Sequence, residues 1–324
     1  MKRYTALILC LVLLASLLAG CHKPVKEPEA AVRVAALKGP TAMGLVRLMD
    51  ETEQGASEGN YTFTVAATAD EVTPRLVQGE LDLAAIHANL ASVLWNNTDG
   101  GLTVLAVNTL GVLYLVQMNF PVTKWQDLRG QTVYCTGKGS TPEYTLRYLL
   151  LQNGLDPDSD VTLEFKSEPA EIVAALGEAG SGIAMLPQPY TTVAQMNVPG
   201  LEICMDLTDE WYKLEGESWL ITGVLVARTK FVEENPEAIE LFLKEYEASV
   251  RFTQENAAEA AALIERFGIV KAAVAEKALP YCNVVCVTGE DMKTALSGYL
   301  RVLFTQNPKA VGGKVPADSF YYVK

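Results

Sequence analysis

The chain has 324 residues, of which 49% are hydrophobic and 20% charged, and its formal net charge at pH 7 is −13. This acidic balance disfavours nucleic acid and anionic lipid as partners, because both require a basic protein face. It does not restrict a small ligand, whose site can carry its own local charge. The length is enough for two ordinary domains.

The first twenty residues are typical of a secretory signal. Met1–Arg3 is basic, and the apolar run Ala6–Leu18 is too short for a comfortable membrane span. The run ends in LAGC at 18–21, which resembles the lipobox of bacterial lipoproteins. We expect residues 1–20 to be removed and the Cys21 thiol to be lipidated; the alternative is an uncleaved anchor helix with an incidental cysteine. Residues 21–31, rich in Pro, Glu and Lys, then form a flexible tether.

A strand, a Gly/Thr-rich turn and a helix are predicted twice. The apolar segment Val32–Leu37 is followed by KGPT at 38–41 and a helical stripe that includes Leu45 and Met49. The segment Gln131–Cys135 is followed by GKGSTP at 137–142 and another helical stripe. Lys38 and Lys138 differ by the same offset as Thr41 and Thr141.

A second pair of segments follows the same offset. Gly79–Ile86 leads into HAN at 87–89, and Gly180–Leu186 leads into PQP at 187–189. We interpret the echo as two similar α/β lobes; the alternative is a coincidence among common strand–helix units. Glu80 and Asp82 are expected at a solvated strand start.

The lobes should be joined where apolar runs lie between them. Leu102–Val107 and Val112–Val116 are strand-like and are interrupted by NTLG at 108–111, and Trp219–Ala227 is a later apolar run. These points divide the chain into a first lobe, 32–108 plus 222–324, and a second lobe, 109–221. Three C-terminal helices are expected, starting at Asn235-Pro236 and covering 257–267 and 291–304.

The predicted turns suit ligand binding. In open α/β sheets, ligands bind beyond the carboxyl ends of the strands, where helix N-termini offer unpaired N–H groups to a carboxylate, sulfonate or phosphate. The turns Lys38–Met43 and Gly137–Glu143 each place Gly, Thr and Lys at such a helix start. Facing one another across a hinge, they would form a clamp. Neither has the glycine spacing or Gly-Lys-Thr order of a Walker A loop.

At these residues the sequence resembles solute-binding lipoproteins of ABC importers, of the nitrate/sulfonate/taurine (NMT1/THI5-like) type. The resemblance lies in VNTLGVLY at 107–114, TGKGSTPEY at 136–144 and NPKAVGGK at 307–314. It implies an α/β type II periplasmic-binding-protein fold, with two Rossmann-like lobes, a hinge and an interlobe cleft. It also implies an extracytoplasmic protein, membrane-anchored through Cys21, that delivers a small organic solute, anionic or heterocyclic, to a membrane permease. A monomer is expected.

The resemblance and the predicted turns together give a set of candidate ligand-binding residues. His87 departs from the family, whose members often have proline there; its near-neutral reference pKa would make binding pH-sensitive if it pairs with the ligand. Thr41, Ser140 and Thr141 are hydroxyl donors to the ligand or N-caps of their own helices. Aromatic candidates either stack on a planar ring or pack in the core. The full set is Lys38, Gly39, Thr41, Ala42, Met43, His87, Asn89, Thr109, Gly111, Ser140, Thr141, Tyr144, Gln188, Tyr190 and Trp219.

Catalysis, metals and cofactors are not expected. There is no Gly-x-Ser-x-Gly turn, and His87 is the only histidine beyond the tether, so a triad would require His87 to meet a nucleophile, and Cys135 lies on an apolar strand. A zinc site is not expected, because the close pair Cys282 and Cys286 has no second pair to complete a tetrahedron. Cys282 and Cys286 are expected to be free buried thiols rather than a bridge across a tight loop. Two other functions stay open: an enzyme of the same fold that acts on a pyrimidine precursor and uses His87, and a lipoprotein that senses a solute for a membrane receptor.

Overall fold

The computed structural model describes residues 31–215 and 218–323. The signal segment 1–20, Cys21 and the tether up to residue 30 lie outside this range, so the predictions made for them remain predictions. In the described ranges, no helix is both long and apolar enough to cross a membrane. The four cysteines in these ranges are free thiols, as expected for Cys282 and Cys286.

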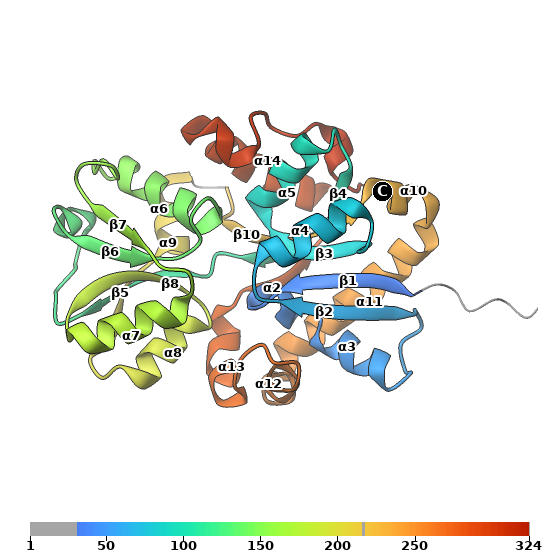
Figure 1. The fold of residues 1–324 in the computed structure, drawn as a ribbon, viewed down its shortest axis with the longest axis horizontal. Coiled ribbons are helices and arrows are strands. Elements are labelled where there is room, and N and C mark those ends of the chain that lie inside the picture. Colours follow the sequence, from blue (N-terminus) through green and yellow to red (C-terminus); the bar gives the residue numbers. More distant parts are fainter. Residues whose placement is uncertain (1–30, 216–217, 324) are drawn as a thin grey trace, which may run out of the picture. The chain divides into compact units, whose positions relative to one another are not determined.

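Two sheets form the framework (Figure 1). The six-stranded first sheet has the order β11-β4-β10-β3-β1-β2, in which β1 pairs in parallel with β2 and β3 while β10 and β11 run antiparallel to their neighbours. Its strands are β1 (Val32–Leu37), β2 (Tyr61–Ala66), β3 (Leu83–His87), β4 (Leu102–Leu110), β10 (Ile221–Arg228) and β11 (Val284–Val287).

The five-stranded second sheet has the order β7-β6-β8-β5-β9. Its parallel strands β6, β7 and β8 repeat the arrangement of β1, β2 and β3, with an antiparallel β5 beside β8. The echo in the sequence therefore corresponds to a structural repeat. The strands are β5 (Leu113–Met118), β6 (Thr132–Cys135), β7 (Thr162–Phe165), β8 (Gly182–Pro187) and β9 (Leu201–Asp206).

Helices cover both faces of each sheet. Figure 1 shows α5 and α14 on one side of the first sheet and α3, α11 and α12 on the other. The three predicted C-terminal helices are present as α11, α12 and α14. The helices are α2 (Pro40–Met43), α3 (Val46–Glu53), α4 (Ala69–Gln78), α5 (Ala88–Asn97), α6 (Thr141–Gln152), α7 (Pro169–Ala179), α8 (Tyr190–Asn197), α9 (Leu207–Glu215), α10 (Thr229–Glu234), α11 (Pro236–Glu255), α12 (Ala257–Arg266), α13 (Ala272–Ala278) and α14 (Gly289–Gln306), with the short 3-10 helices η1 (Trp125–Leu128), η2 (Leu279–Tyr281), η3 (Pro308–Val311) and η4 (Asp318–Phe320).

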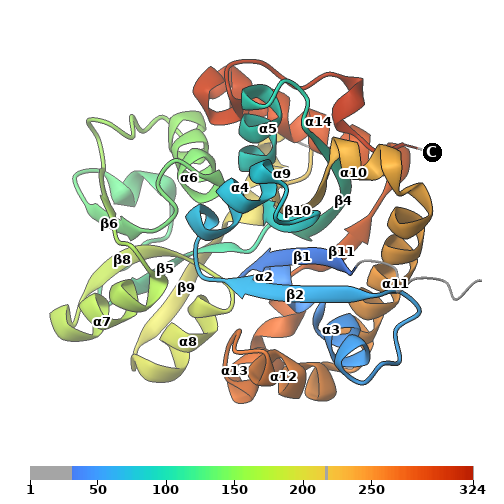
Figure 2. The ribbon, with the colours of Figure 1, turned by 45° about the vertical axis from the view of Figure 1, so that its right-hand side comes forward.

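The chain passes from the first sheet to the second through two residues only, Gly111 and Val112 (Figure 2). The predicted interruption at 108–111 is wrong for its first three residues, because β4 continues to Leu110. Pairing with β10, in which Gly223 lies opposite Thr109, satisfies the backbone of this segment. Gly223 is required there, since a β-carbon would lie 2.4 Å from the Asn108 side-chain oxygen.

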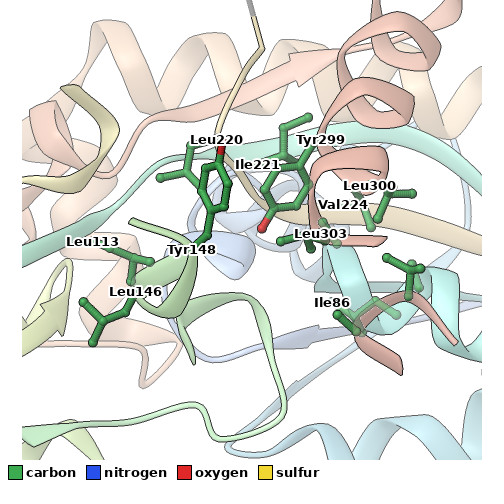
Figure 3. Close-up of a cluster of buried hydrophobic side chains, with 14 of the residues drawn as sticks. Ile86, Leu113, Leu146, Tyr148, Leu220, Ile221, Val224, Tyr299, Leu300 and Leu303 are labelled. Carbon is green, nitrogen blue, oxygen red and sulfur yellow. The ribbon is translucent and has the colours of Figure 1, made fainter. Parts of the chain in front are cut away.

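One hydrophobic cluster joins the two sheets. It contains side chains from α5 and α14, which pack on the first sheet, and from α6 and α9, which pack on the second. Figure 3 shows part of it, with Tyr148 from α6 and Tyr299 from α14. Separate clusters fill the opposite faces, under α3, α11 and α12 in the first sheet and under α7 and α8 in the second. Trp95 and Trp125 are buried.

Asp82 contradicts its predicted solvated position. Its side chain is buried between two arginines, Arg33 on β1 and Arg228 on β10, and Nη2 of each lies 2.7 Å from Asp82 Oδ1. Glu80 is exposed and lies 3.5 Å from Arg75. The prediction for Asp82 is wrong because a buried aspartate requires paired cations, and the two arginines that pair with it come from distant parts of the chain.

Candidate functional site

A cleft of about 780 Å³ is lined by residues that follow strands of both sheets. The strands β1, β2 and β3 end at the cleft on one side, and β6, β7 and β8 end there on the other. Val112 in the crossover, the adjacent Leu113, and Leu37 and Leu90 contribute apolar surface. A cleft at the carboxyl ends of parallel strands is where α/β folds bind ligands.

Within the described ranges, six helices start at the cleft: the short α2, and α4, α5, α6, α7 and α8. The start of α4 is occupied internally, because Thr68 and Glu71 form a capping box. The residues that precede α5, α6, α7 and α8 give no side-chain cap to their helices. At α5 and α7 in particular, first-turn N–H groups remain to satisfy an acceptor, and the helix dipole gives these ends a partial positive charge.

Three lysines and two carboxylates line the cleft. Lys166 is paired with Glu164 at 2.7 Å, so its charge is compensated. The Lys138 ammonium lies over the Phe165 ring, 5.8 Å from the centroid. Lys38 and Lys138 make no ion pair with any residue in the described ranges, and the acidic residues Asp70 and Glu168 are exposed. The cleft therefore carries two lysines without a direct ion pair, and two exposed carboxylates line the same cleft.

His87 ends β3 and lines the cleft, half-buried and without a hydrogen-bond partner in the described part of the chain. Burial lowers the pKa of His87 to about 4, because desolvation penalises the imidazolium and no carboxylate compensates. In the unliganded protein the ring is neutral at pH 7. The prediction that His87 makes binding pH-sensitive depends on its pairing with the ligand, and it stays a prediction.

The depressed pKa of His87 predicts a pH-dependent stability. In the unfolded chain the imidazole takes up a proton near its reference pKa of about 6.5, whereas the folded protein resists this down to about pH 4. Between these values the unfolded state binds more protons, so acidification destabilises the fold, by about 2 kcal/mol from pH 7 to pH 5. Urea unfolding at both pH values should show that His87→Gln loses less stability than wild type; equal losses would contradict the assignment.

Nine candidate residues are brought together in the cleft. They come from the ends of β1, β3 and β8, from β4, and from the turn before α6. They are Lys38, Gly39, Thr41, His87, Thr109, Ser140, Thr141, Gln188 and Tyr190.

Three of the hydroxyl residues in this group, Thr41, Ser140 and Thr141, donate to acceptors within the protein, and their contact with a ligand stays a prediction. Thr41 Oγ1 donates to the Leu37 carbonyl at 2.6 Å, and Ser140 Oγ donates to the Gly137 carbonyl at 2.7 Å. Thr141 Oγ1 donates to Asn89 Oδ1 at 3.2 Å. None of them caps its own helix. Their protons hold the turns in shape, and only their lone pairs remain for a ligand.

Six candidates lie elsewhere, four of them in packing positions. Ala42 and Met43 are fully buried in the core under α3 and α11, because the short helix α2 turns them inward. Gly111 is at the crossover, where a β-carbon would lie 2.1 Å from Thr208 Oγ1. Trp219 packs against the cluster that joins the sheets.

The other two candidates, Asn89 and Tyr144, face different structures. The Asn89 amide accepts from Thr141 N at 3.0 Å and donates to the Ala310 carbonyl at 3.1 Å, so it ties the starts of α5 and α6 to η3. Tyr144 lines a smaller cavity of about 400 Å³ between α6 and the end of α14, together with Arg147. Neither side chain lines the main cleft.

Several cleft residues were not among the candidates. Thr68, Thr136, Phe165 and Ser167 follow β2, β6 and β7, and Thr222 lies on β10. The strand–turn–helix signal did not identify β2, whose burial alternates along the strand, or β7, which has no buried residue. Within the described ranges, no group of three or more His, Cys, Asp or Glu side chains could hold a metal ion.

Comparisons with known proteins agree with this architecture. Residues 26–265 match the model of the NMT1-like family. No curated protein is significantly similar to the chain in sequence. Among solved structures, an ABC transporter from Parabacteroides distasonis is similar with a TM-score of 0.76 and 22% identity, over 91% of this chain and 100% of that chain.

Two further structures bind sulfonates according to their descriptions. The periplasmic aliphatic sulphonate binding protein SsuA from Escherichia coli has a TM-score of 0.73 and 18% identity, over 91% of this chain and 92% of its own. The alkanesulfonate-binding protein SsuA from Xanthomonas axonopodis pv. citri, bound to MOPS, has a TM-score of 0.68 and 14% identity, over 89% and 95%. At these identities the likeness establishes the fold, which is the predicted α/β fold of periplasmic binding proteins with two sheets.

Proposed function

The chain belongs to the NMT1-like family, and from that premise we propose that it is the extracytoplasmic solute-binding component of an ABC importer. The observation that carries the proposal is the cleft of about 780 Å³, in which the carboxyl ends of strands from both sheets converge. A cleft of this size holds a small organic molecule. The similar structures that are described as ABC-transporter and sulfonate-binding proteins support this role.

The favoured solute carries an acidic group. Lys38 and Lys138 line the cleft without a direct ion pair to any described residue, and the uncapped starts of α5 and α7 add partial positive charge. Phe165 and Tyr190 offer aromatic surface for an apolar or planar remainder. A sulfonate or carboxylate attached to a small organic body satisfies both features, whereas an uncharged heterocycle leaves the two lysines without a counter-ion.

Capture proceeds by closure of the two lobes, 32–108 plus 222–324 and 109–221, on the solute. Candidate contacts lie on both sides, with Lys38 and His87 from the first and Gln188 and Tyr190 from the second. A solute that touches both sides stabilises the closed state through its higher affinity for that state. The two-residue crossover at Gly111 and Val112 is the natural hinge.

In this proposal, the lipid on Cys21 anchors the protein to the membrane. Several acyl chains hold it at the outer face of the cytoplasmic membrane, because each buried methylene contributes about 0.8 kcal/mol. The tether 21–31 then lets the folded part reach the mouth of the permease. We propose that the protein works there as a monomer.

Small-angle scattering tests capture. We expect the radius of gyration to fall when a screen of sulfonates, carboxylates, pyrimidines, flavins and amino-acid derivatives includes the right solute, with a rise in melting temperature for the same compound. Glycerol and sodium chloride at matched osmolarity serve as controls. A compound that binds tightly with no contraction would refute closure, and a screen without any binder would count against the solute-binding role.

The enzymatic alternative has no specific observation in its favour. A reacting His87 needs a neighbour that orients it or accepts its proton. Its ring makes no hydrogen bond with the residues in 31–215 or 218–323. The sensing alternative uses the same cleft and differs only in the membrane partner.

A further inference from the structure

Gln188 follows β8 directly and is 2% exposed, yet it lines the cleft. Its backbone is fixed, because Gln188 N donates to the Val112 carbonyl at 2.9 Å, beside the crossover. Its side-chain oxygen, Oε1, accepts from Thr192 Oγ1 at 2.9 Å and from Thr192 N at 3.3 Å, in the first turn of α8. The end of the side chain is therefore held by two donors.

This arrangement determines which way the amide points. A backbone N–H can only donate, so the atom that faces Thr192 N must be the oxygen, and Nε2 must point away from α8. Nε2 has no acceptor among the residues that the structure describes. Gln188 Nε2 therefore offers a free donor at the cleft, held in place by the two bonds to the oxygen of the same amide, and a ligand oxygen or a water molecule can accept from it.

Thr136 adds a second unused group on the side of the cleft that is formed by the ends of β6 and β8, called here the β6–β8 wall. It follows β6, which pairs in parallel with β8 through Val133 and Ile183, so both residues lie at the carboxyl edge of neighbouring strands. Thr136 is 7% exposed, and its hydroxyl has no partner in the described ranges. Lys138, two residues further along, contributes an ammonium group without a direct ion pair to any described residue. The β6–β8 wall therefore offers donors, while the Gln188 oxygen is already occupied.

We propose that Gln188 Nε2 and the Thr136 hydroxyl bind an oxygen atom of the solute's acidic group, and that Thr192 is a positioning residue that fixes the Gln188 amide. The inference rests on the proposed solute-binding function and assigns one end of the solute to the β6–β8 wall. Its chemical class is an oxyanion, because a carboxylate or sulfonate oxygen accepts both hydrogen bonds and is attracted by Lys138. Thr192 contributes without contact to the solute.

Thr191 provides a matched control for Thr192. It is the preceding residue of α8, it is fully buried, and its Oγ1 donates to the Leu186 carbonyl at 3.1 Å. Thr191→Val removes one buried hydrogen bond from the same helix but leaves Gln188 held. Thr192→Val removes the hydroxyl that holds Gln188 Oε1, while Thr192→Ser keeps it.

The experiment is a nuclear magnetic resonance titration of the purified protein with methanesulfonate, the smallest sulfonate. We expect Gln188→Ala to weaken binding about tenfold, since a hydrogen bond to a charged group is lost. Gln188→Glu should weaken it further, because a carboxylate repels the anion. Thr192→Val should weaken binding about threefold, Thr192→Ser should restore it, and Thr191→Val should leave it unchanged.

The outcomes separate this inference from the proposed function. No binding of methanesulfonate to the wild-type protein, or equal binding by wild type and Gln188→Ala, overturns the subsite. If another compound still contracts the protein, the solute-binding function stands without the subsite at Gln188 and Thr136. Equal loss in Thr191→Val and Thr192→Val, with no restoration by serine, reduces Thr192 to a structural residue and overturns its positioning role.

Discussion

Asp82→Ala should lower the free energy of unfolding by about 3 kcal/mol, because it leaves two arginines without their shared counter-ion. Asp82 accepts from Arg33 Nε at 2.8 Å and from Nη2 of both Arg33 and Arg228 at 2.7 Å. Desolvation by itself would raise the pKa of Asp82, but the hydrogen bonds from Arg33 and Arg228 outweigh it and hold the pKa below its usual value. Because Arg33 is partly exposed, we expect the loss to lie at the lower end of the range for breaking a buried ion pair.

Urea unfolding followed by circular dichroism at pH 7 measures this loss. Asp158→Ala is the control, because Asp158 also pairs with an arginine at 2.7 Å but has a side chain that is 77% exposed. Such a surface pair contributes about 1 kcal/mol or less. The interpretation fails if the two variants lose the same stability. Asp82→Asn should fall between them, since it keeps the shape of the site but not the charge.

The repeated α/β units were predictable from local pattern. The strand Val32–Leu37 has the predicted bounds, and the stripe from Leu45 to Met49 falls largely in α3; the predicted turns 38–41 and 137–142 already contain the first residues of α2 and α6. An apolar run followed by Gly and Thr indicates a strand and its turn within about ten residues. Parallel strands then bring their carboxyl ends to one edge of the sheet. That is why nine candidates meet in one cleft.

The residues that sequence placed wrongly depend on distant partners. Asn89 lies just after β3, where a ligand residue was expected, but its amide donates a hydrogen bond to the Ala310 carbonyl. No sequence feature near residue 89 indicates that partner. Asp82 is placed inside by Arg228 in the same way. Gly111 resembles a loop glycine, yet its function is the close approach of Thr208. Such pairings are tertiary, so one sequence without its fold cannot reveal them.

Trp211→Ala should lower the free energy of unfolding by about 3–5 kcal/mol, through lost burial and the cavity left behind. Trp211, in α9, is fully buried, with its ring centroid 5.0 Å from that of Tyr148 in α6 and 5.4 Å from that of Tyr299 in α14. Urea unfolding followed by circular dichroism measures the loss. Trp211→Phe should lose much less, because it keeps an aromatic ring and removes an indole N–H that has no partner in the described residues.

Because α6 and α9 pack on the second sheet and α14 on the first, Trp211 also joins the two sides of the cleft. If the proposed closure keeps this cluster intact, we expect the two lobes to rotate about it and the contact between α8 and α13 to change. Trp95→Ala is the control: Trp95 belongs to the same cluster, but its ring packs on Phe320 in η4, which contacts β4 of the first sheet. Both alanine variants should lose stability, but only Trp211→Ala should enlarge the radius of gyration of the unliganded protein. If Trp95→Ala enlarges it equally, the cluster around Trp211 is not the pivot.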